Sequence, residues 1–509
     1  MTLNNLLRAT IGSAAARRDW ITTHAEPSWR SDVLLGKPAQ SILLVVCLAV
    51  MPLVIPSLGR LLSFKGQSYR AILPNPRDLI SFRARTAPAN VIGGSEVDAL
   101  DISDPTPRSN PNDECNAQLI DDPAHALDHF YAALTRTDAR QGNAITRITH
   151  YGDSPITNDG ITGTARRLLQ ERFGDAGHGF ILVDRPWAWY GHQAINFSSS
   201  GSWNDDSLMN PMTKDGCFGL GGVTFHAGAG RSARFATASD GDTGKSFSRL
   251  DVYYLQQPGG GQFSVSVNGG DTQTASTNGD AARSGFYQIK AATGGANFFE
   301  VKTLSGNVRM FGAVLENDGP GVVYDSLGVN GAYAGLLARV MNQQHWTEQL
   351  QHRHPELVIL NYGTNESEYA DDDQLARYEK ELREVVVRVR AALPDVSILV
   401  VSPMDRGKHA PGGRVITLES IPKIVEMQHR VAAETNCGFL NMFAAMGGEG
   451  TMARWHNGKK HLVGGDLTHP TADGAETVGV ILYGALVDGY AQYRARTAVV
   501  ERAKVLKKK

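Results

Sequence analysis

The pattern of apolar residues changes twice, near residues 199 and 319, and this change constrains the fold more than any other feature of the chain. Between these positions, short alternating segments such as GVTFHAG, SARFATAS and NFFEVKTLSG are separated by Gly, Ser, Thr and Asn. They predict an antiparallel sandwich or jelly roll of roughly eight strands. On either side, apolar strand-like runs alternate with stretches of helical spacing. The sequence therefore predicts an α/β domain interrupted by an inserted all-β domain, which we expect to be stable on its own.

A serine follows the first strand of the predicted α/β domain. In ITRITHYGDSPITNDG, residues 145–151 alternate as in a strand, and the chain then turns at Gly152 and Ser154. The next segment, TGTARRLLQERFG, has helical spacing, and Gly174 at its end predicts the helix C-terminus. Doubly wound sheets bind ligands at such strand-to-helix turns, because the strand ends open a crevice toward the positive N-terminus of the helix. A helix N-cap is the alternative interpretation of this serine.

Residues with chemically useful side chains or backbone N–H groups also follow the later predicted strands. If these strands are parallel, their carboxyl ends meet at the same edge of the sheet as Ser154. The residues concerned are Gly331 in GVNGA, Asn365 in GTNES, Asp405 and Arg406 in PMDRG, and Asp466 and His469 in GGDLTHP.

These residues fit the machinery of acyl transfer. His469 can accept the proton of the Ser154 hydroxyl, and Asp466 can orient the imidazole and stabilise its charged form. The backbone N–H groups of Ser154 and Gly331 and the amide of Asn365 can bind a developing oxyanion. A turn role for Asn365 and a surface position for His469 remain the alternatives.

The ordered set YGDSP, LGVNGA, NYGTNES and DLTHP resembles the SGNH, or GDSL, hydrolase superfamily. The resemblance implies a flavodoxin-like three-layer α/β hydrolase domain with Ser154, Asp466 and His469 as catalytic residues and Ser154, Gly331 and Asn365 as the oxyanion hole. The third block of that family more often reads Gly-x-Asn-Asp, whereas Glu366 follows the asparagine here. This difference leaves the geometry of the local turn open.

A narrower resemblance is to the peptidoglycan O-acetylesterase branch, in which a jelly roll similar to a carbohydrate-binding module is inserted after the first block. It rests on the position of the insert and on FLNMFAAMGGEGTMARWHNGKKHLVGGDLTH. It implies removal of acetyl groups from an O-acetylated glycan of the cell envelope or an extracellular polysaccharide. Transfer of acetyl groups by the same site, or an inactive anchored glycan-binding protein, are the alternatives.

Five further residues are candidates for substrate binding. The segment RPWAWYGHQ contains aromatic rings that can stack on sugars, although core packing or an interdomain contact explains them equally well. The candidates are Trp187, Trp189, Asp153, Asp405 and Arg406. The histidines of QHRHPE and WHNGKKH lack a metal-ligand partner set, so we expect no metal and no other cofactor.

The N-terminal part carries an uncharged run, SILLVVCLAVMPLVIPS, within residues 38–59. Its length predicts a single transmembrane helix, with a cleaved signal peptide or a buried core helix as weaker alternatives. Lys and Arg flank the run equally on both sides and do not decide its orientation. We favour a catalytic domain outside the cytoplasm, in the periplasm or at the cell surface, where other envelope polysaccharide-modifying enzymes are candidate partners.

The formal net charge of −2 does not indicate a basic surface that would bind nucleic acid, so we expect no nucleic-acid partner. Pairing of Cys115 with Cys217 is left open by the spacing of the cysteines.

The predicted organisation is an N-terminal tail (1–37), an anchor (38–59), a linker (60–120), the first hydrolase part (121–198), the inserted sandwich (199–319), the second hydrolase part (320–495) and a basic tail (496–509).

Overall fold

The computed structural model describes residues 120–508, apart from 201–202, 240, 293–294 and 370. The predicted anchor at 38–59 lies outside these residues, as do Cys115 and nearly all of the predicted linker. Among the helices of the described part, none combines the length and the apolar character needed to cross a bilayer.

The α/β domain is built on a five-stranded parallel sheet. The strand order is β13-β1-β14-β15-β18, which is 2-1-3-4-5 when the strands of this sheet are numbered along the chain. This is the flavodoxin-like order, in which the carboxyl ends beside the first strand form the ligand crevice. The strands are β1 (Ile145–Gly152), β13 (Gly321–Gly328), β14 (Leu357–Asn361), β15 (Ser397–Val401) and β18 (Gly438–Leu440).

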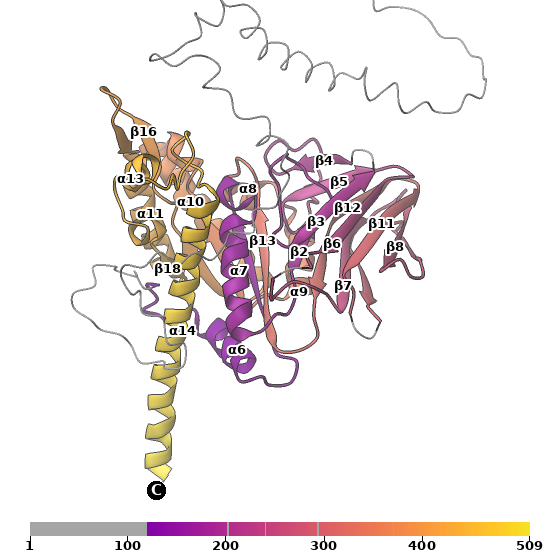
Figure 1. Ribbon diagram of the computed structural model, residues 1–509, viewed down its shortest axis with the longest axis horizontal. Coiled ribbons are helices and arrows are strands. Elements are labelled where there is room, and N and C mark those ends of the chain that lie inside the picture. Colours follow the sequence, from indigo (N-terminus) through magenta and orange to yellow (C-terminus); the bar gives the residue numbers. More distant parts are fainter. Residues whose placement is uncertain (1–119, 201–202, 240, 293–294, 370, 509) are drawn as a thin grey trace, which may run out of the picture. The chain divides into compact units, whose positions relative to one another are not determined.

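Helices cover both faces of this sheet, because successive strand residues face opposite sides and both sides are apolar. Ile148 and Ile359 contribute to a cluster with α6 (Asp128–Asp138), α7 (Gly160–Phe173) and α14 (Ala472–Lys508). Val358 and Leu360 contribute to the opposite cluster, with α8, α9, α10 and α11. The helices of this second layer are α8 (Ala334–Arg339), α9 (Gln343–Arg353), α10 (Asp372–Ala392) and α11 (Ser420–Glu434). The domain therefore has three layers, and the end of α14 extends beyond the sheet (Figure 1).

Several short elements lie at the edge of the sheet where the parallel strands end. They are the 3-10 helices η2 (Ser154–Ile156) and η3 (Glu366–Tyr369), the hairpin of β16 (Gly407–His409) and β17 (Val415–Thr417), and the helices α12 (Met442–Ala445) and α13 (Thr451–Asn457).

The insert forms two antiparallel sheets, of orders β10-β7-β12-β5-β4 and β3-β6-β11-β8-β9. Aromatic side chains such as Tyr254 of β7 and Phe263 of β8 pack between them, with ring centroids 5.2 Å apart. The strands are β3 (Ile195–Ser200), β4 (Asn204–Ser207), β5 (Val223–Ala227), β6 (Ser232–Thr237), β7 (Arg249–Gln256), β8 (Gln262–Val267), β9 (Gln273–Ser276), β10 (Arg283–Lys290), β11 (Phe298–Ser305) and β12 (Val308–Glu316). The antiparallel strands that the sequence predicted in this region are thus present, in two sheets.

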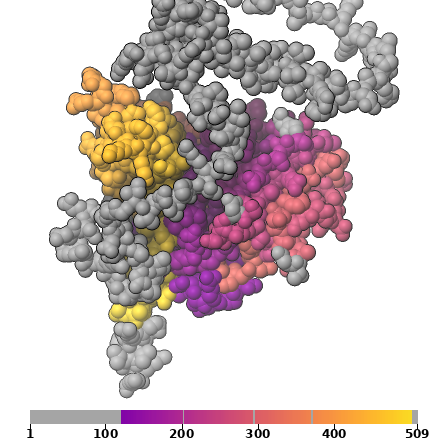
Figure 2. All heavy atoms as spheres, in the orientation of Figure 1, coloured from indigo at the N-terminus to yellow at the C-terminus, as the bar shows by residue number. Residues whose placement is uncertain are grey.

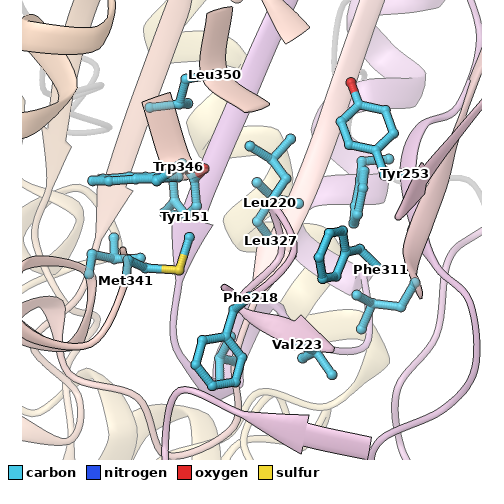
Figure 3. Packing of buried hydrophobic residues seen from close by; sticks show 14 of the residues in the cluster. Tyr151, Phe218, Leu220, Val223, Tyr253, Phe311, Leu327, Met341, Trp346 and Leu350 are labelled. Carbon is cyan, nitrogen blue, oxygen red and sulfur yellow. Dashed lines mark hydrogen bonds between the residues drawn. The ribbon is translucent and has the colours of Figure 1, made fainter. Parts of the chain in front are cut away.

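The sandwich and the α/β domain share strands and one hydrophobic core. Strand β2 (Gly179–Leu182) leaves the α/β part of the chain and pairs with β12 of the sandwich. Tyr151 and Trp346 of the α/β domain lie in the same buried cluster as Phe218 and Phe311 of the insert (Figure 3). The Trp346 indole N–H donates to the Tyr151 hydroxyl at 2.9 Å inside this cluster. Figure 2 shows the purple surface of the first hydrolase part adjoining the magenta surface of the sandwich.

This shared core corrects the expectation of an independently stable insert. Removing the sandwich would expose buried side chains of both parts to water, which costs about 25 cal/mol for each Å² of apolar surface. The prediction of an independent insert was wrong because Gly- and Ser-rich strand patterns indicate where the architecture changes. They do not indicate that apolar side chains of the insert pack against those of the α/β domain.

Candidate active site

The turn that carries Ser154 is dictated by close packing at the end of β1. A Cβ atom on Gly152 would lie 2.8 Å from the Asn361 carbonyl oxygen, so only glycine fits there. Ser154 then begins the 3-10 helix η2, and α7 starts later, at Gly160. Asp159 precedes α7 at its N-cap position. Ser154 is therefore not the N-cap of the following helix, and the alternative interpretation of this serine is wrong.

Ser154, His469 and Asp466 form a continuous hydrogen-bond chain. The Ser154 Oγ lies 2.7 Å from His469 Nε2. On the other side of the ring, His469 Nδ1 lies 2.6 Å from Asp466 Oδ2. A carboxylate at Nδ1 holds the imidazole in the tautomer whose Nε2 can accept a proton from the serine. The three residues that the sequence pointed to are thus brought together in the arrangement that serine hydrolases use.

The loop of Asp466 and His469 is pinned by its own backbone. Asp466 Oδ1 accepts hydrogen bonds of 3.1 Å from the N–H groups of Thr468 and His469. Leu467, between Asp466 and Thr468, has a φ of 56°, in the left-handed region that costs a non-glycine residue energy. Partial burial alone would raise the pKa of Asp466, but the hydrogen bonds from the His469 ring and the two amides lower it. The carboxylate is therefore charged where an imidazolium would form.

Two other loops meet the serine turn and carry the predicted oxyanion donors. Gly331 follows β13 with a φ of 74°, a conformation that favours glycine. The Asn365 side-chain N–H donates to the Ala332 carbonyl at 2.9 Å, so the Asn365 loop touches the Gly331 loop directly. The Val329 N–H in turn donates to the Gly152 carbonyl at 3.1 Å. An asparagine amide has two N–H groups, which leaves one for a ligand.

Glu366 resolves the open question of the turn after Asn365. One carboxylate oxygen accepts from the Ala334 N–H at 2.9 Å and the other from the Gly363 N–H at 3.0 Å. This carboxylate therefore ties the loops of Gly331 and Asn365 together. Burial and then the charge of Asp153 raise the pKa of Glu366 to about 8. The sequence signalled Glu366 only as a departure from the family pattern, and its structural role was missed.

Asp153 is buried, which corrects its assignment as a substrate-binding candidate. Its side chain is 3% exposed, and Oδ2 accepts a hydrogen bond of 3.2 Å from the Thr364 N–H. Burial raises the pKa of Asp153 to about 7, against the hydrogen bonds from Thr364. The residue thus joins the serine turn to the Asn365 loop. Adjacency to Ser154 in the sequence could not reveal that the side chain points inward.

Asp405 and Arg406 also contact protein groups. Asp405 is buried, and its Oδ2 accepts from the Met452 N–H at 2.8 Å in α13, so it is not available to a substrate. The Arg406 guanidinium donates to the Thr364 carbonyl at 2.9 Å and to the Thr468 hydroxyl at 3.2 Å. Because Thr468 neighbours His469, Arg406 links the oxyanion loop to the histidine loop. The assignment of Asp405 is therefore replaced by a structural role, whereas substrate binding by the partly exposed Arg406 stays a prediction.

The two tryptophans have different surroundings. Trp187 packs edge-on against Tyr190, with centroids 6.3 Å apart, and joins the shared core. Trp189 is 54% exposed. The same segment contacts the serine turn, because the Gly191 N–H donates to the Thr157 carbonyl at 3.4 Å. Trp189 therefore remains a candidate for ligand stacking, whereas Trp187 is partly buried and packs against the shared core.

The oxyanion geometry predicts a specific kinetic defect. Asn365→Ala should lower kcat for ester hydrolysis by about 10²- to 10³-fold with little change in KM, because the lost amide would act mainly on the transition state. Asn361→Ala is the matched control, since that amide donates only to the Val401 and Ser402 carbonyls, at 3.2 Å each. Steady-state kinetics on an aryl acetate compares the two. Equal losses of kcat in both variants would argue against an oxyanion role for Asn365.

Comparison with known proteins is consistent with this site. Residues 292–477 match the sequence model of the GDSL-like Lipase/Acylhydrolase family. The matched range holds Gly331, Asn365 and His469, whereas Ser154 precedes it because the sandwich interrupts the domain. Comparison with curated protein sequences finds no match.

Among solved structures, a peptidoglycan O-acetylesterase is similar to this chain, with 25% sequence identity and a TM-score of 0.60, over 72% of this chain and 96% of the other. A family two carbohydrate esterase from Cellvibrio japonicus has 12% identity and a TM-score of 0.24, over 58% and 99% of the two chains. An acetyl xylan esterase has 15% identity and a TM-score of 0.26, over 32% and 80%.

Proposed function

We propose that this SGNH-type esterase, whose residues 292–477 match the GDSL-like Lipase/Acylhydrolase family model, removes O-acetyl groups from a cell-envelope or extracellular polysaccharide. The observation that carries the proposal is the complete hydrogen-bond chain from Ser154 to Asp466 at an open surface. The His469 and Asp466 side chains keep 46% and 53% of their exposure, which suits a polymer that must approach from outside.

In the first half of the proposed reaction, the Ser154 Oγ attacks the acetyl carbonyl carbon while His469 Nε2 takes the hydroxyl proton. The carbonyl π electrons move to oxygen, and the N–H groups of Ser154, Gly331 and Asn365 bind the resulting oxyanion. The intermediate collapses when the bond to the sugar oxygen breaks. His469 returns its proton to that oxygen, so a free sugar hydroxyl leaves and Ser154 keeps the acetyl group.

In the second half, a water molecule attacks the acetyl-enzyme while His469 again accepts a proton. The second oxyanion collapses, the bond between the acetyl carbon and the Ser154 Oγ breaks, and the proton on His469 returns to the serine. Acetate leaves and the enzyme is restored. Attack by water is supported by the open surface around the triad, because the half-exposed ring of His469 is accessible to solvent.

Two features support a glycan as the alcohol side of the ester. The peptidoglycan O-acetylesterase structure aligns with this chain over 96% of its own length and 72% of this chain. We propose that the insert is a jelly roll of carbohydrate-binding type. The exposed ring of Trp189 lies two residues before Gly191, whose N–H donates to the Thr157 carbonyl, and it offers a surface on which sugar rings can stack.

We also propose that the apolar segment at 38–59 anchors the protein in a membrane with the catalytic domain outside the cytoplasm. The support is the length of the uncharged run and the location of envelope glycans. Fractionation of cells that express the full-length chain, followed by protease treatment of spheroplasts, tests this proposal. Protection of residues 120–508 from added protease in spheroplasts would contradict it.

The test of the function is to measure the products formed from O-acetylated peptidoglycan and from O-acetylated xylan by the full-length protein. We expect release of free acetate and de-acetylated sugar by mass spectrometry, with none from the Ser154→Ala variant. An activated acetyl donor supplied with an oligosaccharide should likewise yield mainly acetate. Mostly acetylated sugar would favour transfer, and no product from any acetylated glycan would favour an inactive binding protein.

A further inference from the structure

One loop of the sandwich reaches the oxyanion glycine. The three heavy atoms nearest to an ideal Cβ atom built on Gly331, apart from those of the glycine and its two chain neighbours, are all side-chain atoms of Met209. They are its Cγ at 3.7 Å and its Cε and Sδ at 3.8 Å. These are ordinary van der Waals distances. A thioether from the insert therefore lies against the residue whose N–H faces the reacting carbonyl in the proposed mechanism.

The loop that delivers Met209 is fastened where it leaves β4. Asp206, at 4% exposure, accepts from the Met212 N–H at 3.0 Å and from the Thr213 N–H at 2.7 Å. The neighbouring Leu208 is buried, and its N–H donates to the Gly222 carbonyl at 3.1 Å. The backbone on both sides of Met209 is thus held by hydrogen bonds inside the sandwich.

The far end of the loop is fastened to the α/β domain. The Asn342 N–H donates to the Gly216 carbonyl at 2.9 Å, just before α9. Asp215 pairs with Arg309 of β12, with an N–O distance of 2.5 Å. Val329, two residues before Gly331, lies against the base of the same loop, within 2.9 Å of the Cβ position of Gly222. The loop bridges the two domains, and Met209 is held in place over Gly331.

We propose that Met209 is a wall of the acyl pocket and restricts the ester to short acyl groups such as acetyl. An acyl carbonyl whose oxygen binds the Gly331 N–H puts its alkyl end within a few ångströms of the atoms around that glycine. A methyl group fits beside a methionine side chain, whereas each further methylene competes with it for space. The inserted sandwich would then determine which acyl group is accepted, in addition to contributing to glycan binding.

The test compares aryl acetate with aryl butyrate as substrates of the full-length protein. Met209→Ala should raise the ratio of kcat/KM for butyrate over acetate by about 10-fold or more, the range that one or two methylenes are worth in an apolar pocket. Met209→Leu, which conserves the volume, should keep the ratio of the parent protein. Met212→Ala is the matched control, because its side chain lies on the same loop and is 73% exposed.

A merely structural role for Met209 would lower the turnover of both esters together and leave their ratio unchanged, which would overturn the proposal. If Met209→Ala does not fold, Met209→Val provides the smaller truncation, and a ratio equal to that of Met212→Ala would overturn the proposal in the same way. The inference rests on the proposed function, since it assumes an ester between Ser154 and Gly331. Failure of the parent protein to hydrolyse aryl acetate would refute that function, whereas turnover with an unaltered chain-length preference in Met209→Ala would refute only the role of Met209.

Discussion

Ser154→Ala and His469→Ala should each lower kcat for aryl acetate hydrolysis by about 10⁴- to 10⁶-fold, and the double variant should be no worse than either single one. The reason is that the two side chains, 2.7 Å apart, act as one unit in transferring a proton and forming the acyl-enzyme. Asp466→Asn should have a smaller effect, because the hydrogen bonds around the loop still orient the ring in part. Initial rates with an aryl acetate measure all four variants.

A matched control for local structure is Ser326→Ala. The Ser326 hydroxyl lies behind the same turn, 2.7 Å from the Thr162 hydroxyl and 3.2 Å from the Ile156 carbonyl, and touches no triad residue. Its loss should change the melting temperature more than kcat. If the effects of Ser154→Ala and His469→Ala simply added in the double variant, the two residues would not act as one catalytic unit.

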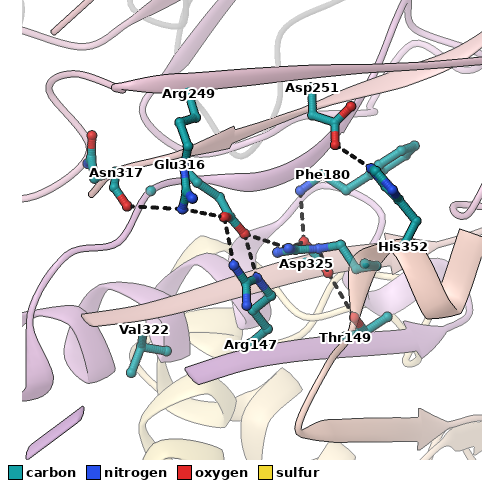
Figure 4. Close-up of polar contacts among 12 residues, drawn as sticks. Arg147, Thr149, Phe180, Arg249, Asp251, Glu316, Asn317, Val322, Asp325 and His352 are labelled. Carbon is teal, nitrogen blue, oxygen red and sulfur yellow. Dashed lines mark hydrogen bonds and ion pairs between the residues drawn. The ribbon is translucent and has the colours of Figure 1, made fainter. Parts of the chain in front are cut away.

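The largest expected effect on stability comes from a buried ion network between the two domains. Arg353 donates to Asp325 with both Nε and Nη2, at 2.8 and 2.9 Å, and to Glu316 of β12 at 2.6 Å. Glu316 also accepts from Arg147 of β1 at 2.8 Å (Figure 4). Arg353→Met should lower the free energy of unfolding by about 3–5 kcal/mol, because it leaves buried carboxylates without their partner. Chemical denaturation of the full-length protein provides the measurement.

Arg249→Met is the control for this network. Arg249 also contacts Glu316, at 2.9 Å, but its side chain is 35% exposed, so solvent screens the pair and the loss should be far smaller. Similar destabilisation by both variants would show that burial does not decide the strength of these contacts. An unchanged stability of Arg353→Met would show that the network does not hold the sandwich on the sheet.

The same network predicts how stability depends on pH. Burial alone would raise the pKa of Glu316, but the guanidinium groups of Arg353 and Arg147 lower it from its ordinary value of 4.5 to about 2. A lowered pKa contributes stability that is present above pH 4.5 and is lost as the pH falls toward 2. The free energy of unfolding should therefore fall more steeply over this range in the parent protein than in Arg353→Met.

Local patterns predicted most of the architecture. Alternation in residues 145–151 and the helical spacing before Gly174 correspond to β1 and α7, which ends at Phe173. The turn chemistry after each parallel strand led to Ser154, Gly331, Asn365 and His469, because parallel strands of one sheet bring their carboxyl ends to one edge. These signals are local, so each strand, helix or turn can be predicted from its own residues.

What the sequence could not predict depends on packing between distant segments. The inward direction of Asp153, the loop contacts of Glu366 and the position of Met209 over Gly331 all arise where separate loops meet. Strand β2 was missed as a partner of β12 because strand pairing leaves no trace in a four-residue apolar run. Polar and small residues at such meeting points carry no periodic pattern that would reveal their partners.

The most direct test of the account is to locate the acetyl group during turnover. The full-length protein is mixed with an aryl acetate, quenched in acid within the first turnovers, digested and analysed by mass spectrometry. The account predicts one acetylated peptide, modified at Ser154, which is absent from Ser154→Ala. Acetylation at a different residue, or continued acetate release by Ser154→Ala at the rate of the parent protein, would contradict it.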